Sequence, residues 1–231
     1  MRIDRFLVRA GIASRKDAKG LIRGKRITVN AEVIKNANVK VDYQQDEICL
    51  DGVKIEYKEY VYLMLNKPQG VISATVDEKH KTVIDIVSDY SHYDLHPVGR
   101  LDIDTEGLLI ITNDGKLTHN IISPKKHIPK TYFARLASKI EVDAIGKFKE
   151  GITLGDGYEC MSAELTILNE TEIELTIYEG KFHQVKRMFK ALDNEVIYLK
   201  RIKMNNLDLD NQLELGSYKE LSEDELKLLS E

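Results

Sequence analysis

The stretch HPVGRLDIDTEG at residues 96–107 is followed by the apolar run LLIIT at residues 108–112. A glycine-bounded polar loop leading into such a run predicts a buried strand near the centre of a sheet. Asp102 and Asp104 stand one residue apart in this loop. Aspartates in such loops often satisfy the backbone of a turn, so the spacing alone leaves a structural role open beside a catalytic one.

Strand and helix patterns alternate on both sides of this loop, which predicts an α+β body with a mixed, largely antiparallel sheet. The segments expected as strands are residues 60–66, 107–112, 130–136 and 172–178. Residues 142–150 and 183–192 have helical spacing, and the capping box from Ser222 to Glu225 predicts a terminal helix.

The first part of the chain predicts a separate small domain. Apolar residues at helical spacing predict a helix over residues 3–10, and Ser14 is positioned to cap a second one. Residues 27–33 read as a hairpin and residues 46–50 as a further strand. The polar stretch 51–59 predicts a linker, which gives domains at residues 1–59 and 60–231.

Charge is distributed unevenly between these domains. Residues 1–40 hold 11 Lys/Arg and 3 Asp/Glu, a net charge of +8, whereas the remainder carries −12 and the whole chain −4. Arg15, Lys19 and Arg23 recur every four residues and form one face of the second helix, here called the basic stripe. A solvated helix face is the usual meaning of such a pattern, but a basic module on an acidic body indicates a polyanionic partner.

Composition restricts the class of protein further. Cys49 and Cys160 are the only cysteines and form no C-x-x-C pair, so neither a disulfide framework nor a zinc site is expected. No stretch approaches the roughly 20 apolar residues of a membrane span. We therefore expect a cytoplasmic protein that does not insert into membranes, and a monomer by default.

The first domain resembles the alpha-L RNA-binding domain. The resemblance rests on SRKDAKGLIRGKRITVN at residues 14–30, flanked by a helix and a hairpin. It implies that basic side chains of this domain contact RNA phosphates. These are Arg2, Arg5, Arg15, Lys19, Arg23 and Arg26.

The body resembles the RsuA/RluB/RluE/RluF group of bacterial ribosomal RNA pseudouridine synthases, across essentially the full chain. The loop and strand at residues 96–115 carry the group's signature, and three further motifs occur in the expected order. These are NKPQG at residues 66–70, KTY at residues 130–132 and EGKFHQVKRM at residues 179–188. Length and a short tail after the last strand resemble the small-subunit member more than its large-subunit relatives.

The resemblance implies a role for each matching residue. Asp102 is the catalytic carboxylate, Lys186 pairs with it, and Tyr132 lies against the target base in a central cleft. Asp104 would fix the loop together with Thr105. The remaining residues expected to contact substrate are Arg100, Asn66, Lys67, His183, Gln184 and Arg187.

Elementary chemistry agrees with this assignment. Isomerising uridine breaks an N-glycosidic bond and rejoins the uracil through carbon, so no redox cofactor, group donor or metal is required. Asp102 would either attack the ribose carbon or remove a ribose proton, and both routes need the ionised carboxylate, which burial opposes. On a helical wheel Lys186 borders the apolar face, whereas Arg187 points nearly opposite, so Lys186 is the better placed cation.

Two alternatives remain open at this point. One is a catalytically inactive assembly factor that binds ribosomal RNA, which the presence of Asp102, Tyr132 and Lys186 disfavours. The other is a metal-dependent RNA-processing enzyme using Asp102 and Asp104, which lacks an evident third ligand. One departure from the family pattern is Asn205, where a glycine is usual; asparagine also tolerates left-handed backbone angles.

Overall fold

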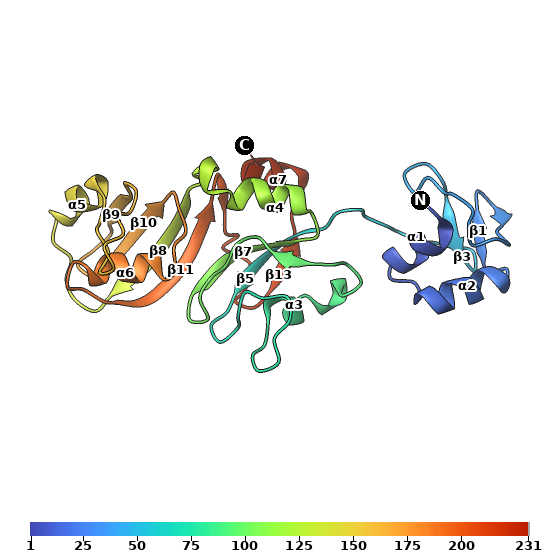
Figure 1. The fold of residues 1–231 in the computed structure, drawn as a ribbon, viewed down its shortest axis with the longest axis horizontal. Coiled ribbons are helices and arrows are strands. Elements are labelled where there is room, and N and C mark those ends of the chain that lie inside the picture. Colours follow the sequence, from blue (N-terminus) through green and yellow to red (C-terminus); the bar gives the residue numbers. More distant parts are fainter. Residues whose placement is uncertain (231) are drawn as a thin grey trace. The chain divides into compact units, whose positions relative to one another are not determined.

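A computed structural model describes residues 1–230, which form two compact units (Figure 1). The first comprises Met1–Val61 together with Asp89–Asp94, and the second comprises Tyr62–Ser88 and the chain from Leu95 onward. The sequence did not predict that Asp89–Asp94, which lie far along the chain, group with the first unit.

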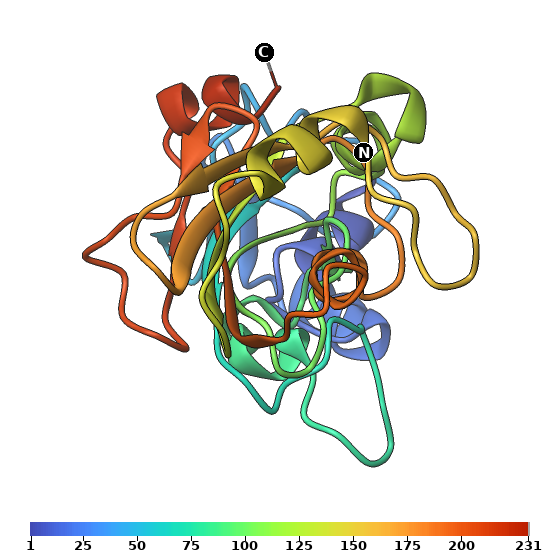
Figure 2. The ribbon, with the colours of Figure 1, turned by 90° about the vertical axis from the view of Figure 1, so that its left-hand side faces the viewer.

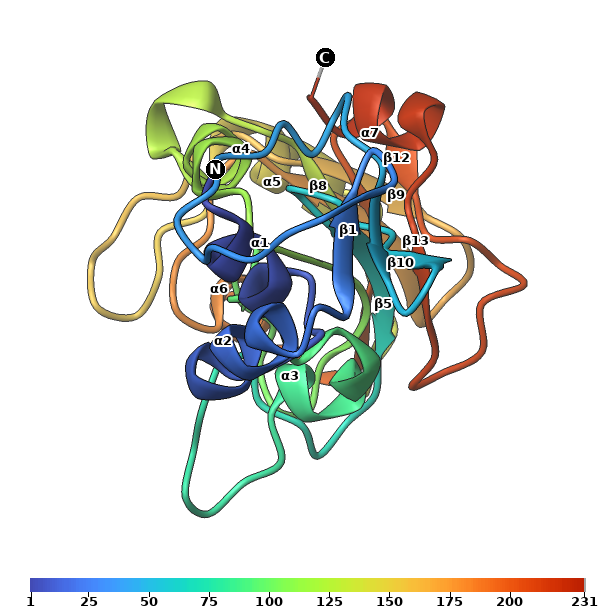
Figure 3. The same cartoon turned by 90° about the vertical axis from the view of Figure 1, so that its right-hand side faces the viewer.

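The first unit consists of two helices and a four-stranded sheet. The helices, α1 (Ile3–Arg9) and α2 (Arg15–Arg23), contact each other (Figure 3). The strands lie in the order β2-β1-β3-β4. Their bounds are Ile27–Val29 for β1, Glu32–Val33 for β2, Ile48–Leu50 for β3 and Val53–Lys54 for β4.

Local sequence explains these elements. The side chain of Ser14 accepts a hydrogen bond from the Asp17 amide at 3.2 Å, so the predicted helix cap is confirmed. Phe6 and Ile22 are almost fully buried and pack the two helices on the sheet. The predicted linker is wrong over its first half, because β4 pairs with β3 and Ile55 is buried in this core.

The second unit is built on a nine-stranded sheet whose main path runs β13-β5-β7-β11-β8-β10-β9. β7 and β11 are parallel, and the other neighbouring pairs are antiparallel, which makes the sheet mixed. The strands of this path are β5 (Tyr62–Lys67), β7 (Glu106–Thr112), β8 (Lys130–Leu136), β9 (Glu164–Ile167), β10 (Glu172–Ile177), β11 (Val196–Met204) and β13 (Tyr218–Glu220). Two short strands, β6 (His96–Pro97) and β12 (Leu207–Asp208), pair with β7 and β11.

Helices cover both faces of this sheet. They are α3 (Val83–Ile86), α4 (Gly115–Ile122), α5 (Ala144–Glu150), α6 (Gln184–Lys190) and α7 (Glu223–Ser230), with 3-10 turns η1 (Ser88–Tyr90) and η2 (Pro124–Lys126). Figure 1 shows α4 and α7 next to each other on one side of the sheet and α3 on the other, and Figure 2 shows the red α7 and the green-cyan α3 at opposite ends of the view. Leu108 and Ile110 of β7 face the α4 side, where they pack with Ile121 and Leu229. The alternate residues of β7 therefore face the opposite side.

Several local predictions are confirmed in detail. The capping box before α7 forms, with the Ser222 amide donating to Glu225 Oε2 at 2.9 Å and the Glu225 amide donating to the Ser222 hydroxyl at 3.2 Å. Asn205 has φ = 52°, the left-handed conformation that asparagine was expected to tolerate at this position. Within residues 1–230, every helix is too short or too polar to cross a lipid bilayer.

Candidate active site

Asp102 lies in the loop between β6 and β7, and this loop is held in place by Lys67. The Lys67 ammonium donates to the carbonyl oxygens of Asp102 at 3.0 Å, Thr105 at 2.9 Å and Pro68 at 3.0 Å. Lys67 has no exposed surface. Burial lowers the pKa of Lys67 to about 8, with the carboxylates of Asp104, Asp102 and Glu106 acting in the opposite direction.

Two further contacts fix the same loop. The Ser73 hydroxyl donates to the Leu101 carbonyl at 2.9 Å and accepts from the Leu101 amide at 3.0 Å. The Gly70 amide donates to the Ile103 carbonyl at 2.8 Å. The backbone on both sides of Asp102 is therefore bound to the segment that follows β5, which limits where its carboxylate can point.

The carboxylate of Asp102 faces two groups from the start of α6. Lys186 Nζ lies 3.7 Å from Asp102 Oδ2, and His183 Nε2 lies 3.6 Å from Asp102 Oδ1. The Asp102 side chain is 28% exposed and that of Lys186 is 23% exposed. Each oxygen of this carboxylate therefore has a nitrogen of α6 or of its preceding turn within 4 Å.

Lys186 makes its closer contact with Asp104, which corrects one expectation. Lys186 Nζ lies 2.5 Å from Asp104 Oδ1, so Asp104 does not simply fix the loop with Thr105. Burial opposes ionisation of Asp104, but the hydrogen bond and charge of Lys186 outweigh it and lower the pKa of that carboxyl. Lys186 is shared between two carboxylates and does not pair with Asp102 alone.

A row of directly opposed residues crosses the sheet next to this loop. Lys67 pairs with Gly107, Gly107 with Arg201, and Arg201 with Tyr132. Directly opposed residues in neighbouring strands share one face, so these side chains lie on the same face of the sheet. Tyr132 is 8% exposed and Arg201 only 1%. The row therefore places Lys67, which holds the Asp102 loop, on the same face of the sheet as Tyr132 of the KTY motif.

The missing side chain of Gly107 leaves space for the backbone of Arg201 in the neighbouring strand. Its φ is +101°, and an added Cβ would lie 2.2 Å from the Arg201 carbonyl oxygen. Arg201 donates from Nε to the Leu108 carbonyl at 2.7 Å, while its buried Nη2 has no hydrogen-bond partner among residues 1–230. The glycine after Glu106 therefore allows β11 to approach β7 closely.

The turn before α6 is built on buried polar side chains. Gln184 accepts from the Lys181 amide at 2.9 Å and donates to Glu179 at 3.0 Å. Glu179 also accepts from the Tyr158 hydroxyl at 2.6 Å and the Met161 amide at 2.9 Å. Gln184 was expected to contact substrate, but at 4% exposure its amide instead stabilises this turn.

Three other residues that were expected to contact substrate instead bind groups of the protein itself. Arg187 pairs with Asp156 at 2.5 Å and donates to the Phe182 carbonyl at 3.3 Å. Asn66 is buried, with its amide group donating to the Leu213 carbonyl at 2.8 Å. Lys67 is fully committed to the three carbonyls described above. Burial gives Asn66 and Lys67 a positioning role in place of the predicted contact with substrate, whereas for Arg187, 28% exposed, that contact stays a prediction.

The basic surface of the first unit is only partly neutralised. Arg2 pairs with Asp4 at 2.5 Å, and Arg26 pairs with Asp51. Arg5 is exposed, as are the three residues of the basic stripe, and within residues 1–230 none of these four forms an ion pair. The stripe therefore remains available to a polyanion.

Known protein families match both parts of the chain. A family model described as RNA pseudouridylate synthase matches residues 61–191, and an S4 domain model matches residues 1–48. The chain belongs to the RNA pseudouridylate synthase family. The S4 match covers the region for which the sequence predicts an RNA-binding domain, and the α+β class with a mixed sheet is confirmed.

Relatives of the synthase span the whole chain. An uncharacterized RNA pseudouridine synthase of Bacillus subtilis, YtzG, is 43% identical and covers 100% of this chain and 99% of its own. Proteins named ribosomal small subunit pseudouridine synthase A from Vibrio cholerae and Escherichia coli are 41% and 39% identical, each over 98% of both chains. A solved pseudouridylate synthase structure matches with a TM-score of 0.70 and 37% identity over 99% of both chains.

Sequence reasoning missed three residues that build the synthase site. Ser73 acts through hydrogen bonds to the distant residue Leu101, so no local pattern marks it, and Glu179 lies in the EGKFHQVKRM motif without having been assigned a role. Arg201 was detectable as a cation in an otherwise alternating strand, and its burial is the new finding. No group of three or more histidine, cysteine or acidic side chains suited to a metal occurs in the described part of the synthase.

Proposed function

We propose that this chain converts one uridine of small-subunit ribosomal RNA to pseudouridine, with Asp102 as the catalytic carboxylate. Two of its relatives carry names that specify the small ribosomal subunit. The S4 domain and the basic stripe on α2 suit a partner rich in phosphate, either free ribosomal RNA or a subunit assembly intermediate.

The reaction needs little beyond a placed carboxylate. The bond between N1 of uracil and C1′ of ribose breaks, and a bond between C5 and C1′ forms. The hydrogen on C5 leaves as a proton and N1 gains one, so no electron is transferred and no co-substrate is consumed. Asp102 contributes its ionised form, either by attacking C1′ or by removing a ribose proton.

The surroundings of Asp102 are the observation that carries this proposal. Lys186 and His183 approach its two oxygens at 3.7 and 3.6 Å and orient the carboxylate from both sides. Lys67 binds the carbonyl of the same residue, so the loop presents the carboxylate in one position. Asp104 serves as the second anchor for Lys186.

Two further residues complete the proposed site. Tyr132 lies on the same face of the sheet as Lys67 and Arg201, and its ring can contact the uracil while its hydroxyl handles a proton. Arg100 is exposed and forms no ion pair within residues 1–230. A free guanidinium two residues from Asp102 suits a phosphate of the flipped nucleotide, whose unstacking costs a few kcal/mol.

The test is to map pseudouridines in ribosomal RNA from a strain lacking this protein. We expect one small-subunit pseudouridine to disappear, to return with the wild-type chain, and to stay absent with Asp102→Asn. The amide keeps the shape of the side chain, so RNA binding by the variant should remain near wild type. A full set of pseudouridines in the deletion strain would instead favour the inactive assembly factor, and a loss in large-subunit RNA would correct the substrate.

A further inference from the structure

Phe182 is an aromatic side chain that the fold leaves in solvent. It lies in the turn before α6 and is 76% exposed. Within residues 1–230 the other large hydrophobic side chains above 70% are the valines at positions 53, 76 and 142, which are much smaller. Leaving a phenyl ring in water forgoes roughly 25 cal/mol for each Å² of apolar surface that remains unburied.

One face of this ring is already stacked. The rings of Phe182 and His183 have centroids 3.8 Å apart and planes inclined by only 18°. His183 in turn places Nε2 at 3.6 Å from the Asp102 carboxylate. The stacked pair therefore has one exposed ring, that of Phe182, and one ring, that of His183, in contact with the Asp102 carboxylate.

The turn that carries Phe182 is rigidly built. The Phe182 carbonyl accepts from Arg187 Nη1, whose guanidinium is anchored by Asp156. The preceding amide, of Lys181, donates to the buried Gln184 side chain. His183 adopts a left-handed φ of 48°, a conformation that a non-glycine residue keeps only where its surroundings hold it. These contacts fix the backbone that carries the ring.

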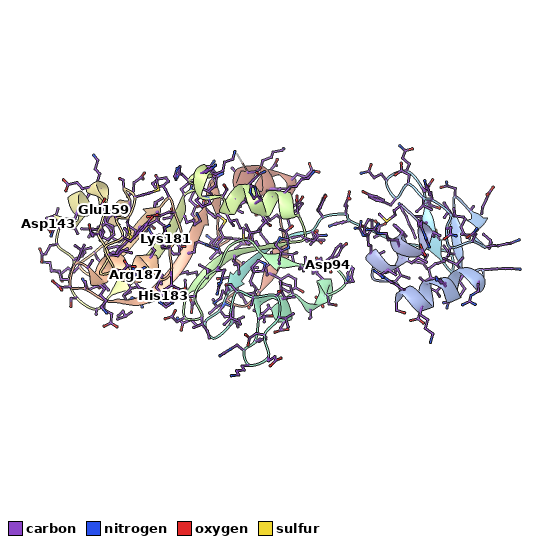
Figure 4. All side chains as sticks on the ribbon, viewed as in Figure 1. Asp94, Asp143, Glu159, Lys181, His183 and Arg187 are labelled. Carbon is purple, nitrogen blue, oxygen red and sulfur yellow. The ribbon has the colours of Figure 1, made fainter. Side chains whose placement is uncertain are left out.

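The neighbouring charges suit a nucleic acid. Figure 4 shows Lys181, His183 and Arg187 grouped at this turn of the second unit. Lys181 is exposed, and its ammonium lies 4.6 Å from the centre of the Tyr158 ring, with no carboxylate in residues 1–230 forming an ion pair with it. A phosphate beside the ring would therefore find a cation next to it.

We propose that the exposed face of Phe182 stacks on a nucleobase of the bound RNA, adjacent in the strand to the uridine that is isomerised. This inference rests on the proposed function. When the uridine leaves its stack, the neighbouring base loses a stacking partner, and the Phe182–His183 pair replaces it. Every base has a π-face, so this contact holds the flipped state without reading a particular base.

The chain contains no tryptophan, which gives a direct test. Phe182→Trp introduces a single tryptophan, and Asp102→Asn in the same chain prevents turnover during titration with small-subunit ribosomal RNA transcribed in vitro. Stacking on a base should quench the indole emission by about half or more. The matched control is Val142→Trp, at a site 75% exposed whose neighbour Asp143 lies well apart from His183 in Figure 4; its emission should change little.

Kinetics supply the second arm. Phe182→Ala and Phe182→Leu should each lower kcat/KM by roughly 5- to 150-fold, the range expected for loss of one base–aromatic stack. Phe182→Tyr should stay within about threefold, because it keeps the ring. Val142→Ala should match wild type. A Phe182→Leu enzyme as active as wild type would show that the ring is not used for stacking.

The two arms separate this inference from the proposed function. If the wild-type chain forms pseudouridine but the indole of the Phe182→Trp variant does not respond to RNA, the stacking contact is overturned and the isomerase stands. If RNA quenches the indole of the Phe182→Trp variant but the wild-type chain forms no pseudouridine, the proposed isomerase activity is overturned and the stacking contact stands. Thermal midpoints of the Phe182 variants should equal that of wild type, since an exposed ring contributes little to the core.

Discussion

Replacing Lys67 with methionine should both destabilise the protein and displace its catalytic loop. Methionine keeps most of the stem but removes three hydrogen bonds of 2.9–3.0 Å from a fully buried ammonium. Each such bond contributes roughly 1.5–3 kcal/mol, and a buried carbonyl left unpaired costs about 1–3 kcal/mol. Removing a buried charge offsets part of this loss, which leaves a net decrease of about 3 kcal/mol in the free energy of unfolding.

That decrease corresponds to a thermal midpoint lower by roughly 6–12 °C for a chain of this size. The Asp102 carbonyl would lose its tether, and a misplacement of about 1 Å can reduce turnover by around 100-fold. Urea unfolding at pH 7 and single-turnover pseudouridine formation measure the two effects. Lys130→Met is the matched control for stability, because that half-buried lysine donates to only one carbonyl, of Ile128, at 2.8 Å.

The same variant tests the titration of Lys67. Burial lowers the pKa of Lys67 to about 8, below the roughly 10.4 of an unfolded lysine, so the unfolded chain binds more protons between these values. The difference in free energy of unfolding between wild type and Lys67→Met should therefore be smallest below pH 8 and rise towards pH 10. A variant within 1 kcal/mol of wild type, with turnover within threefold and a flat pH difference, would refute this reasoning.

Three other sets of variants test the site and the basic stripe. Asp104→Asn frees Lys186 from its 2.5 Å contact and should keep turnover within about tenfold of wild type, unlike Asp102→Asn; equal losses in a rapid-quench assay would contradict the separate roles. Reversing the charge of the basic stripe should flatten the plot of log affinity against log salt by about one per phosphate contact, and an unchanged slope would make the stripe a solvated face. Gly107→Ala, with its Cβ 2.2 Å from the Arg201 carbonyl, should cost more than about 3 kcal/mol in urea unfolding, whereas a near-wild-type transition would mean that β11 can move away.

Periodicity in the sequence was enough to predict most elements of the fold. β8 has the predicted bounds because burial alternates along it, with Tyr132, Ala134 and Leu136 inward. Helix ends were less accurate: the predicted helix 183–192 spans only Gln184–Lys190, since His183 adopts a left-handed φ. The linker prediction failed because Ile55 and Tyr57 pack into a core that is formed mainly by residues distant in the sequence.

The sequence predicted which residues lie in the candidate site, but not which groups they hydrogen-bond. Lys186 lies near Asp102, as the resemblance implied, whereas the approach of His183 to the same carboxylate was not predicted and the role of Asp102 itself stays a prediction. A motif indicates that a polar residue is needed, and not whether its partner is the substrate or the protein. Lys67 and Gln184 illustrate the difference, because both bind backbone groups that are close only in the folded chain.

The turn at residues 179–184 contains both side chains that maintain the fold and side chains that face outward. Glu179 and Gln184 are buried and carry the hydrogen bonds, whereas Phe182 contributes almost nothing to the interior. Substitutions at position 182 should therefore leave folding intact even where they weaken the proposed contact with RNA. A saturation library scored for soluble expression should tolerate nearly all residues at position 182 and few at position 179; equal intolerance at both would show that the two tasks are not separable.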